Sequence, residues 1–520
     1  MRKLSLSDTG FLLMERRETP MHVGGINLFS LPDGADEQSF LASLADILTQ
    51  PDPLRPPFGH KLKTGAAGLL GPCYWEPDEA LDLDYHVRHS ALPKPGRYRE
   101  LFALASRLHG SLLDRDRPLW EMHLIEGLQN RQFATYSKMH HSMIDGIGAM
   151  QLTQAMMSPD PNAVIPYSPL SLEAFNRFRA RHKRKQSDAV EPTELSFSDL
   201  MNITELLKQQ FDSSLNLLST ATKVASVFAG RGGPLTMPWH HVPKTPLNAK
   251  VSGARRFVAQ SWPFDRIRNI AKAFDGTLND AVLAMCAGAL RRYLIAENKL
   301  PDAPMKAMTP VSIRREGDFD SGNAIAFVTA NLATHMADPV KRFGAIQASM
   351  HAGKQMLSDL TPEQAQLFIQ LMQVPLLLTT ITGMASKFPA FTTVVSNVPG
   401  PREVLYWNGA RLDGMYPASI PFDGFAMNIT MVSYAGSLDF GITACRQSLP
   451  RVQRVIDYME EALIELEDAA DLRNQAEAAN TSTRTKAKAA RRKSTARRAT
   501  PKSGHKTPSK TATRKRSTRA

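Results

Sequence analysis

Two adjacent histidines are followed by an acidic residue and a glycine in the run HHSMIDG, which starts at His140 and His141 and ends at Asp145 and Gly146. A neutral imidazole can accept a proton near pH 7, because the ordinary pKa of histidine is about 6.5. Acyl transfer from a thioester to an alcohol needs such a base, and a donor that stabilises the oxyanion. A thioester is already activated, so this reaction needs no nucleophilic serine or cysteine. His141 is therefore the candidate general base.

Asp145 and Gly146 are expected to shape the site rather than to take part in proton transfer. A carboxylate just before a helix often caps it, and Asp145 could instead pair with an arginine, so we expect a structural or orienting role for it. Gly146 would let the backbone turn tightly. His141 and Asp145 could also be two metal ligands at four-residue spacing, but no third ligand lies nearby in the sequence, so we expect no metal. A second pair, His240-His241, lacks the following Asp-Gly and is interpreted as linker.

The segments around HHSMIDG predict a strand hairpin that runs into a helix. Residues 120–124 alternate apolar and polar side chains, residues 127–130 can turn the chain, and residues 133–139 can return as the second strand. After Gly146, apolar residues at helical spacing predict a helix that Pro159 ends. This arrangement places His141 where a strand meets a helix.

The second half of the chain also mixes helices and strands. Thr277 and Asp280 form a variant of the capping box, and residues 282–294 continue as a helix. Strand-like segments lie at 324–331, 392–395, 427–434 and 438–444, the last two flanking a turn at 435–437. Because helices and strands mix in both halves, the predicted fold class is α/β (α+β).

Composition divides the chain into four parts. We expect a first domain at 1–160, a helical linker or crossover at 161–247, a second domain at 248–470 and a disordered basic tail at 471–520. The linker contains a basic run at 179–186, interpreted as a solvated surface, and an amphipathic stretch at 198–228. The tail lacks side chains that could form a core.

The basic charge of the protein belongs to that tail. Of 63 lysines and arginines, 15 lie in residues 481–520 together with no acidic residue, so residues 1–480 carry 48 basic against 50 acidic side chains. The three cysteines, Cys73, Cys286 and Cys445, are scattered and suggest neither a disulfide framework nor a thiolate zinc site. No window approaches the roughly 18 apolar residues of a spanning helix, and no signal peptide is evident. We expect a cytoplasmic protein, soluble or peripheral to a membrane.

Several short motifs follow one another in a fixed order. They are Leu4–Asp8 (LSLSD), Pro20–Gly25 (PMHVGG), Pro118-Leu119-Trp120, HHSMIDG, Asn279-Asp280, Pro310–Arg314 (PVSIR) with Gly322-Asn323, Ser396–Gly400 (SNVPG) and Met427–Thr430 (MNIT). HHSMIDG matches the HHxxxDG motif of the CoA-dependent acyltransferase superfamily. The whole set, over roughly residues 1–470, resembles the bacterial wax ester synthase/diacylglycerol acyltransferase (WS/DGAT) family.

The resemblance implies a fold and a reaction. The fold would be two chloramphenicol-acetyltransferase-like domains, with mixed sheets flanked by helices and an active-site tunnel between them. The reaction would move a long-chain acyl group from acyl-CoA, as substrate and without another cofactor, to a fatty alcohol or diacylglycerol. The expected location is cytoplasmic, peripheral to the inner membrane or to lipid inclusions.

The resemblance also implies roles for individual residues. His141 would be the base, with His140 beside it, and Asn279 would either lie near the site as an oxyanion donor or be a helix-cap neighbour of Asp280. Asp145 would pair with Arg314. Pro118, Leu119 and Trp120 are expected to be structural, because proline fixes a strand edge and tryptophan fills a core.

Three rival functions differ in class. A stand-alone condensation domain that makes amides or esters shares HHxxxDG, but the Pro-Leu-Trp and Asn-Asp motifs point away from it. A nucleic-acid-binding protein would use the basic tail, which can attract anionic lipid or nucleic acid, although the body of the protein is nearly neutral. A non-catalytic lipid-binding relative is opposed by the intact HHxxxDG.

Overall fold

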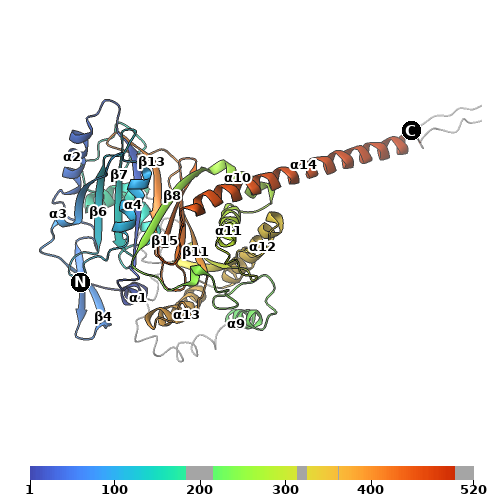
Figure 1. The fold of residues 1–520 in the computed structure, drawn as a ribbon, viewed down its shortest axis with the longest axis horizontal. Coiled ribbons are helices and arrows are strands. Elements are labelled where there is room, and N and C mark those ends of the chain that lie inside the picture. Colours follow the sequence, from blue (N-terminus) through green and yellow to red (C-terminus); the bar gives the residue numbers. More distant parts are fainter. Residues whose placement is uncertain (183–214, 313–324, 361, 498–520) are drawn as a thin grey trace, which may run out of the picture. The chain divides into compact units, whose positions relative to one another are not determined.

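The computed structural model describes residues 1–182, 215–312, 325–360 and 362–497. The chain divides into two units, Met1–Glu467 and Asp468–Ala520. Both six-stranded sheets and the candidate site belong to the first unit (Figure 1).

The first sheet carries the candidate base at the end of a central strand. Its strand order is β12-β13-β2-β7-β6-β5. The strands are β2 (His22–Ser30), β5 (Val87–Ala91), β6 (Trp120–Glu126), β7 (Gln132–His140), β12 (Tyr406–Trp407) and β13 (Ala410–Ala418). β6 and β7 pair antiparallel, so the hairpin predicted from residues 120–139 is confirmed.

The second sheet has the order β10-β9-β11-β14-β15-β8. Its strands are β8 (Arg255–Pro263), β9 (Lys306–Ser312), β10 (Ile325–Asn331), β11 (Thr393–Pro399), β14 (Met427–Tyr434) and β15 (Ser437–Cys445). The four strand-like segments predicted in this half correspond to β10, β11, β14 and β15, and β14 and β15 form the predicted hairpin. A third, smaller sheet has the order β1-β4-β3, from Arg2–Lys3, Gly68–Pro77 and His60–Gly65.

Two strands from the second half of the sequence, β12 and β13, belong to the first sheet. β13 pairs antiparallel with β2 from Ala418↔Gly24 to Arg411↔Ser30. It is also tied to β15, since the Met415 N–H donates to Asp439 Oδ2 at 2.8 Å. The expected division into domains at 1–160 and 248–470 did not include this exchange, and those boundaries stay predictions.

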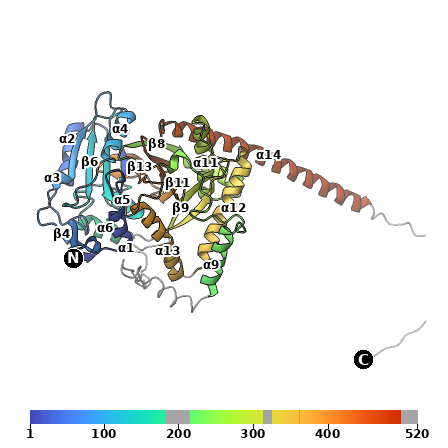
Figure 2. The same ribbon diagram turned by 60° about the horizontal axis from the view of Figure 1, so that its bottom comes forward.

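Helices lie beside both sheets (Figures 1 and 2). The helices in the first half of the chain are α1 (Leu6–Met14), α2 (Glu37–Leu48), α3 (Leu83–His86), α4 (Tyr98–Leu108), α5 (Gly146–Ala155) and α6 (Leu172–His182). The later helices are α9 (Leu215–Phe228), the 3-10 turn η1 (Pro246–Asn248), α10 (Phe264–Ala273), α11 (Leu278–Ala296), α12 (Pro339–Ser358), α13 (Pro362–Ile381) and α14 (Arg454–Arg497). α4 also reaches the second sheet, because the Phe257 N–H of β8 donates to Ser106 Oγ at 2.8 Å.

The last helix extends into the expected basic tail and covers residues 471–497, while the expected disorder of residues 471–520 stays a prediction. α14 continues to Arg497. This segment is rich in Ala, Arg and Lys, which are strong helix formers even where they have no core to pack against. Residues 498–520 and the first part of the amphipathic stretch, 198–214, lie outside the described residues, while α9 covers 215–228. In the ranges that the structure describes, no helix combines the length and apolar character needed to cross a bilayer.

Candidate active site

The HHxxxDG run forms the junction between β7 and α5. β7 ends at His140, which lies opposite His22 of β2, and α5 begins at Gly146. The pairing extends one residue further, since the His141 N–H donates to the Met21 carbonyl at 2.9 Å. The predicted strand-to-helix position of His141 is confirmed.

His141 lies against an aromatic ring from the N-terminal helix. The rings of Phe11 and His141 stack with centroids 4.1 Å apart and planes 9° apart. Burial lowers the pKa of His141 below its ordinary value, and its backbone hydrogen bond and the Asp145 charge oppose this shift. A histidine with a lowered pKa is neutral at pH 7 and can accept a proton.

His140 faces the protein interior. It is fully buried, and its Nδ1 accepts a hydrogen bond from the Ser142 N–H at 3.1 Å and lies 2.6 Å from Ser142 Oγ. Its Nε2 is 3.6 Å from Glu15 Oε1. Burial, followed by the neighbouring His141 and Arg115, lowers the pKa of His140 to about 3. This environment suits a structural residue beside the candidate base.

Asp145 is the N-cap of α5, as the capping interpretation predicted. Its Oδ1 accepts the Gly148 N–H at 2.8 Å, and the residue is buried. Arg314, its expected ion-pair partner, lies outside the described residues, so that pair stays a prediction.

The two glycines after Asp145 are needed for space. Gly146 is the first residue of α5 and does not have a positive φ, so its backbone conformation does not by itself require glycine. A Cβ on Gly146 would lie 3.3 Å from Val398 Cγ2 of β11. A Cβ on Gly148 would lie 2.8 Å from Ile144 Cγ1 and 3.3 Å from Asp145 Oδ1. Close packing therefore accounts for both residues, and the sequence reasoning missed Gly148.

Asn279 is linked to the junction through β11. Asn397, next to Val398, donates through Nδ2 to Asn279 Oδ1 at 2.8 Å. Asp280 completes the predicted capping box, because its Oδ2 accepts the Thr277 N–H at 2.8 Å and lies 2.7 Å from Thr277 Oγ1. The structure thus connects the HHxxxDG, SNVPG and Asn-Asp motifs through neighbouring contacts.

The Pro118-Leu119-Trp120 segment lies at the start of β6 and contacts the end of β7 in the protein interior. All three residues are buried. Trp120 Nε1 donates to the Phe58 carbonyl at 2.8 Å, and the His140 N–H donates to the Leu119 carbonyl at 2.9 Å. These contacts agree with the expected structural role.

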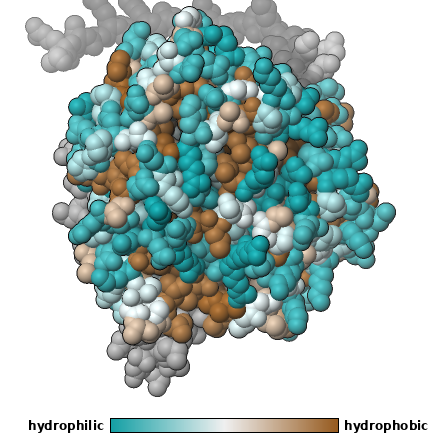
Figure 3. Space-filling view, turned by 60° about the vertical axis from the view of Figure 1, so that its left-hand side comes forward, coloured by the Kyte–Doolittle hydropathy of each residue, from teal (hydrophilic) through white to brown (hydrophobic). Residues whose placement is uncertain are grey.

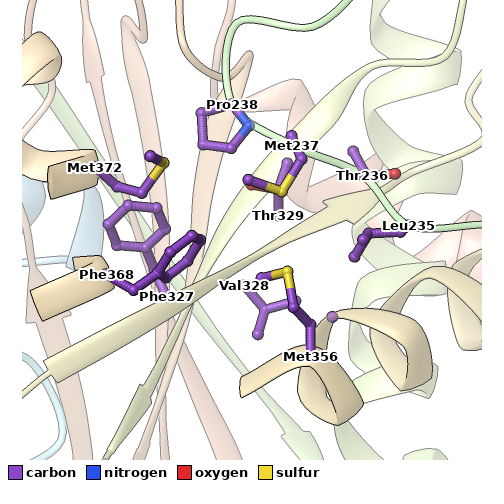
Figure 4. Close-up of a pocket in the computed structure, with 11 residues that line it drawn as sticks. Leu235, Thr236, Met237, Pro238, Phe327, Val328, Thr329, Met356, Phe368 and Met372 are labelled. Atoms are coloured by element: carbon purple, nitrogen blue, oxygen red, sulfur yellow. The ribbon is translucent and has the colours of Figure 1, made fainter. Parts of the chain in front are cut away.

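An apolar pocket with an empty volume of about 290 Å³ lies elsewhere, between the connector before η1, β10, α12 and α13 (Figure 4). Its lining comprises Leu235, Thr236, Met237, Pro238, Phe327, Val328, Thr329, Gly353, Met356, Phe368 and Met372. None of these residues belongs to HHxxxDG or its neighbours. In the described ranges, no group of three or more His, Cys, Asp or Glu side chains is arranged to hold a metal ion.

The comparisons with known proteins agree with the order of motifs. The wax ester synthase/diacylglycerol acyltransferase catalytic domain matches residues 4–282, and the WS/DGAT C-terminal domain matches residues 321–467. A probable diacylglycerol O-acyltransferase of Mycobacterium tuberculosis is 44% identical over 465 residues, which cover 89% of this chain and 98% of the relative. The O-acyltransferase WSD of Acinetobacter baylyi is 41% identical over 463 residues, 89% of this chain and 96% of the relative.

Solved structures show the same relationship. The wax ester synthase/diacylglycerol acyltransferase from Marinobacter aquaeolei VT8 is 37% identical, with a TM-score of 0.70, over 91% of this chain and all of that one. The first condensation domain of the calcium-dependent antibiotic synthetase has a TM-score of 0.52 at 14% identity, over 90% of this chain and 96% of that one, so it shares the fold alone. The chain belongs to the WS/DGAT family of acyltransferases.

Proposed function

We propose that this protein transfers a long-chain acyl group from acyl-CoA to the hydroxyl of a fatty alcohol or a diacylglycerol, with His141 as general base. The products would be a wax ester or a triacylglycerol, and the role would be storage-lipid synthesis. The relatives' names support the reaction class and its acceptors. The observation that carries the role of His141 is its position: a half-buried imidazole with a lowered pKa at the β7–α5 junction.

The chemistry needs few protein groups. His141 takes the proton of the acceptor hydroxyl as its oxygen attacks the thioester carbonyl. When the tetrahedral intermediate collapses, the C–S bond breaks and the protonated His141 returns the proton to the departing CoA sulfur. Asn279 is the proposed donor to the oxyanion, because its Oδ1 is already held by Asn397 and its amide N–H groups can serve another acceptor. A tunnel between the two halves that admits CoA and acceptor from opposite sides belongs to this proposal.

The location proposed is cytoplasmic, with peripheral contact to the inner membrane or to lipid inclusions. On the face in Figure 3, hydrophobic residues form separate patches among hydrophilic ones. Two of the most exposed large apolar side chains are Leu378 of α13, at 55% exposure, and Phe388 after it, at 59%. Such residues can insert shallowly into a lipid surface.

The test is an assay of the purified full-length chain with palmitoyl-CoA and either hexadecanol or a diacylglycerol, following free CoA and the ester product. We expect CoA release that depends on the acceptor, with an equal amount of ester formed. CoA release that ignores both acceptors and yields only free fatty acid would contradict the proposal.

A further inference from the structure

We propose that the N-terminal helix α1 and the residue that follows it position the catalytic histidine, with Phe11 and Glu15 as positioning residues. This inference rests on the proposed role of His141 as base. The sequence motifs near the N-terminus received no role in the reaction, yet the structure places this segment directly against HHxxxDG.

Phe11 fixes the orientation of the His141 ring and excludes water from one of its faces. The two rings are nearly parallel, with 9° between their planes and 4.1 Å between their centroids. A flat stack leaves the edge of the imidazole, where its nitrogens lie, accessible to a reacting hydroxyl. It also contributes to the burial that lowers the pKa of His141.

Glu15 acts through Met21. Glu15 Oε1 accepts the Met21 N–H at 3.1 Å, and the Met21 carbonyl accepts the His141 N–H at 2.9 Å. The Met21 backbone is therefore held through both its N–H and its carbonyl. The hydrogen bond from the His141 N–H to the Met21 carbonyl fixes the position of His141 just beyond His22↔His140, the last residue pair of β2 and β7. Glu15 also contacts the first histidine of HHxxxDG, since its Oε1 is 3.6 Å from His140 Nε2.

Glu15 is itself anchored. Its side chain is 2% exposed, and Arg115 donates to Glu15 Oε2 from Nε at 3.3 Å and from Nη2 at 3.1 Å. A buried carboxylate that accepts two hydrogen bonds from one guanidinium has little freedom to move. α1 lies beside α13 (Figure 2). Arg16, which follows α1, donates to the Thr380 and Ile381 carbonyls of α13.

A purely structural role for α1 predicts different results from a positioning role. Loss of structure lowers the melting temperature and the amount of folded enzyme, but it leaves kcat per folded molecule and its pH profile unchanged. Misplacement of the base lowers kcat in molecules that are folded, and added water at the ring moves its pKa back toward about 6.5.

The experiment compares Glu15→Ala and Phe11→Ala with the conservative variants Glu15→Gln and Phe11→Leu in the full chain. Glutamine can still accept the Met21 N–H, and leucine still covers the ring. For each variant, kcat, KM for palmitoyl-CoA, the pH dependence of kcat/KM and the melting temperature are measured. The matched control is Glu465→Ala, which removes the carboxylate that Arg342 contacts at 2.7 Å and leaves that buried guanidinium without it, away from HHxxxDG.

We expect both alanine variants to lose about 10- to 100-fold in kcat, with KM changed less than about threefold, because small displacements of a base are costly. The acid limb of the Phe11→Ala profile should shift upward, because that variant uncovers the ring, and Glu15→Gln and Phe11→Leu should recover most of the loss. Glu465→Ala should melt earlier with normal kcat. Folded alanine variants with wild-type kcat, together with an unshifted acid limb in Phe11→Ala, would overturn the positioning role. An active His141→Ala would instead overturn the proposed base.

Discussion

At the scale of single residues, the site is surrounded by histidines that are buried without charge. Burial is the largest cause of a lowered pKa in His22, where it falls well below 6.5, and in His109 and His140, where it falls to about 3. His22 Nε2 is 2.8 Å from the His109 carbonyl, and His109 Nδ1 is 2.9 Å from the Tyr136 hydroxyl, so these rings are fixed by neutral partners.

These histidines should make the protein sensitive to mild acid. Between pH about 6.5 and about 3 the unfolded chain binds their protons and the folded chain does not, so the free energy of unfolding rises with pH and falls on acidification. Each such histidine contributes up to about 1.4 kcal/mol per pH unit in this window. Urea unfolding at pH 7.5, 6.5 and 5.5 should show little change above pH 6.5 and a marked loss below it. Equal stability at pH 6.5 and 5.5 would contradict burial of these rings in the neutral form.

The candidate site residues that lie close together in sequence were predictable, and those brought together by folding were not. His140, His141 and Asp145 share one seven-residue run, so spacing alone reveals them. Phe11 and Glu15 reach the same loop only because α1 packs beside it, and no local pattern in the sequence encodes that contact. The order of motifs showed that the N-terminal segment is part of the family pattern, but it did not show which residues that segment contacts.

At the scale of elements, the start of α5 depends on the absence of a side chain at position 148. We expect Gly148→Ala to lower turnover by about 10-fold or more, because the added Cβ would meet Ile144 Cγ1 at 2.8 Å and push the junction that carries His141. Gly344→Ala in α12 is the control, since its Cβ would meet nothing within 4 Å. That variant should keep full activity and gain about 0.4–1 kcal/mol in stability. Equal activity of both variants would show that the junction tolerates the extra atom.

The cap of the same helix separates two roles of Asp145. Asparagine caps a helix about as well as aspartate does, so a role in capping alone predicts that Asp145→Asn is nearly neutral. We expect instead a loss of about 3–5 kcal/mol and of activity, because the substitution breaks the predicted ion pair with Arg314. Denaturant unfolding of Asp145→Asn, Asp145→Ala and the double variant with Arg314→Ala measures the coupling. A fully stable but inactive Asp145→Asn would favour a direct catalytic role.

Local elements followed from the sequence, whereas their partners across the fold did not. The β6–β7 hairpin, α5 and the capped start of α11 were predicted because alternation, helical spacing and cap residues are properties of neighbouring positions. β13 joins the first sheet from far along the chain, at Ala418↔Gly24 to Arg411↔Ser30. Such pairing depends on which edges remain open after folding, and no spacing rule specifies it.

At the scale of the whole molecule, we expect the basic segment to be separable from the unit that contains the candidate site. Residues 481–520 contain 15 Lys or Arg and no acidic residue, and the unit that contains the candidate site ends at Glu467. We expect truncation after residue 475 to leave turnover on dispersed substrates unchanged. Binding to anionic vesicles should weaken, since each basic residue near such a surface contributes about 1 kcal/mol.

Co-sedimentation of both forms with anionic vesicles and with DNA, across a salt series, measures this effect. The full chain should bind more strongly at low salt and lose the difference as salt is raised. Equal binding of the two forms at low salt would remove the anchoring role of the tail. Loss of turnover on truncation would place the boundary of the catalytic unit further along the chain.

A half-buried, neutral His141 that removes the proton of the acceptor hydroxyl is the centre of the proposed mechanism. The direct measurement is kcat of His141→Ala with palmitoyl-CoA and hexadecanol, made on protein whose melting temperature shows that it is folded. We predict that nearly all turnover is lost, by about 10²- to 10⁴-fold, because the missing group takes part in proton transfer. His140→Ala, which removes a ring that faces Glu15 in the interior, should retain more activity than His141→Ala. Wild-type turnover by folded His141→Ala would contradict the mechanism.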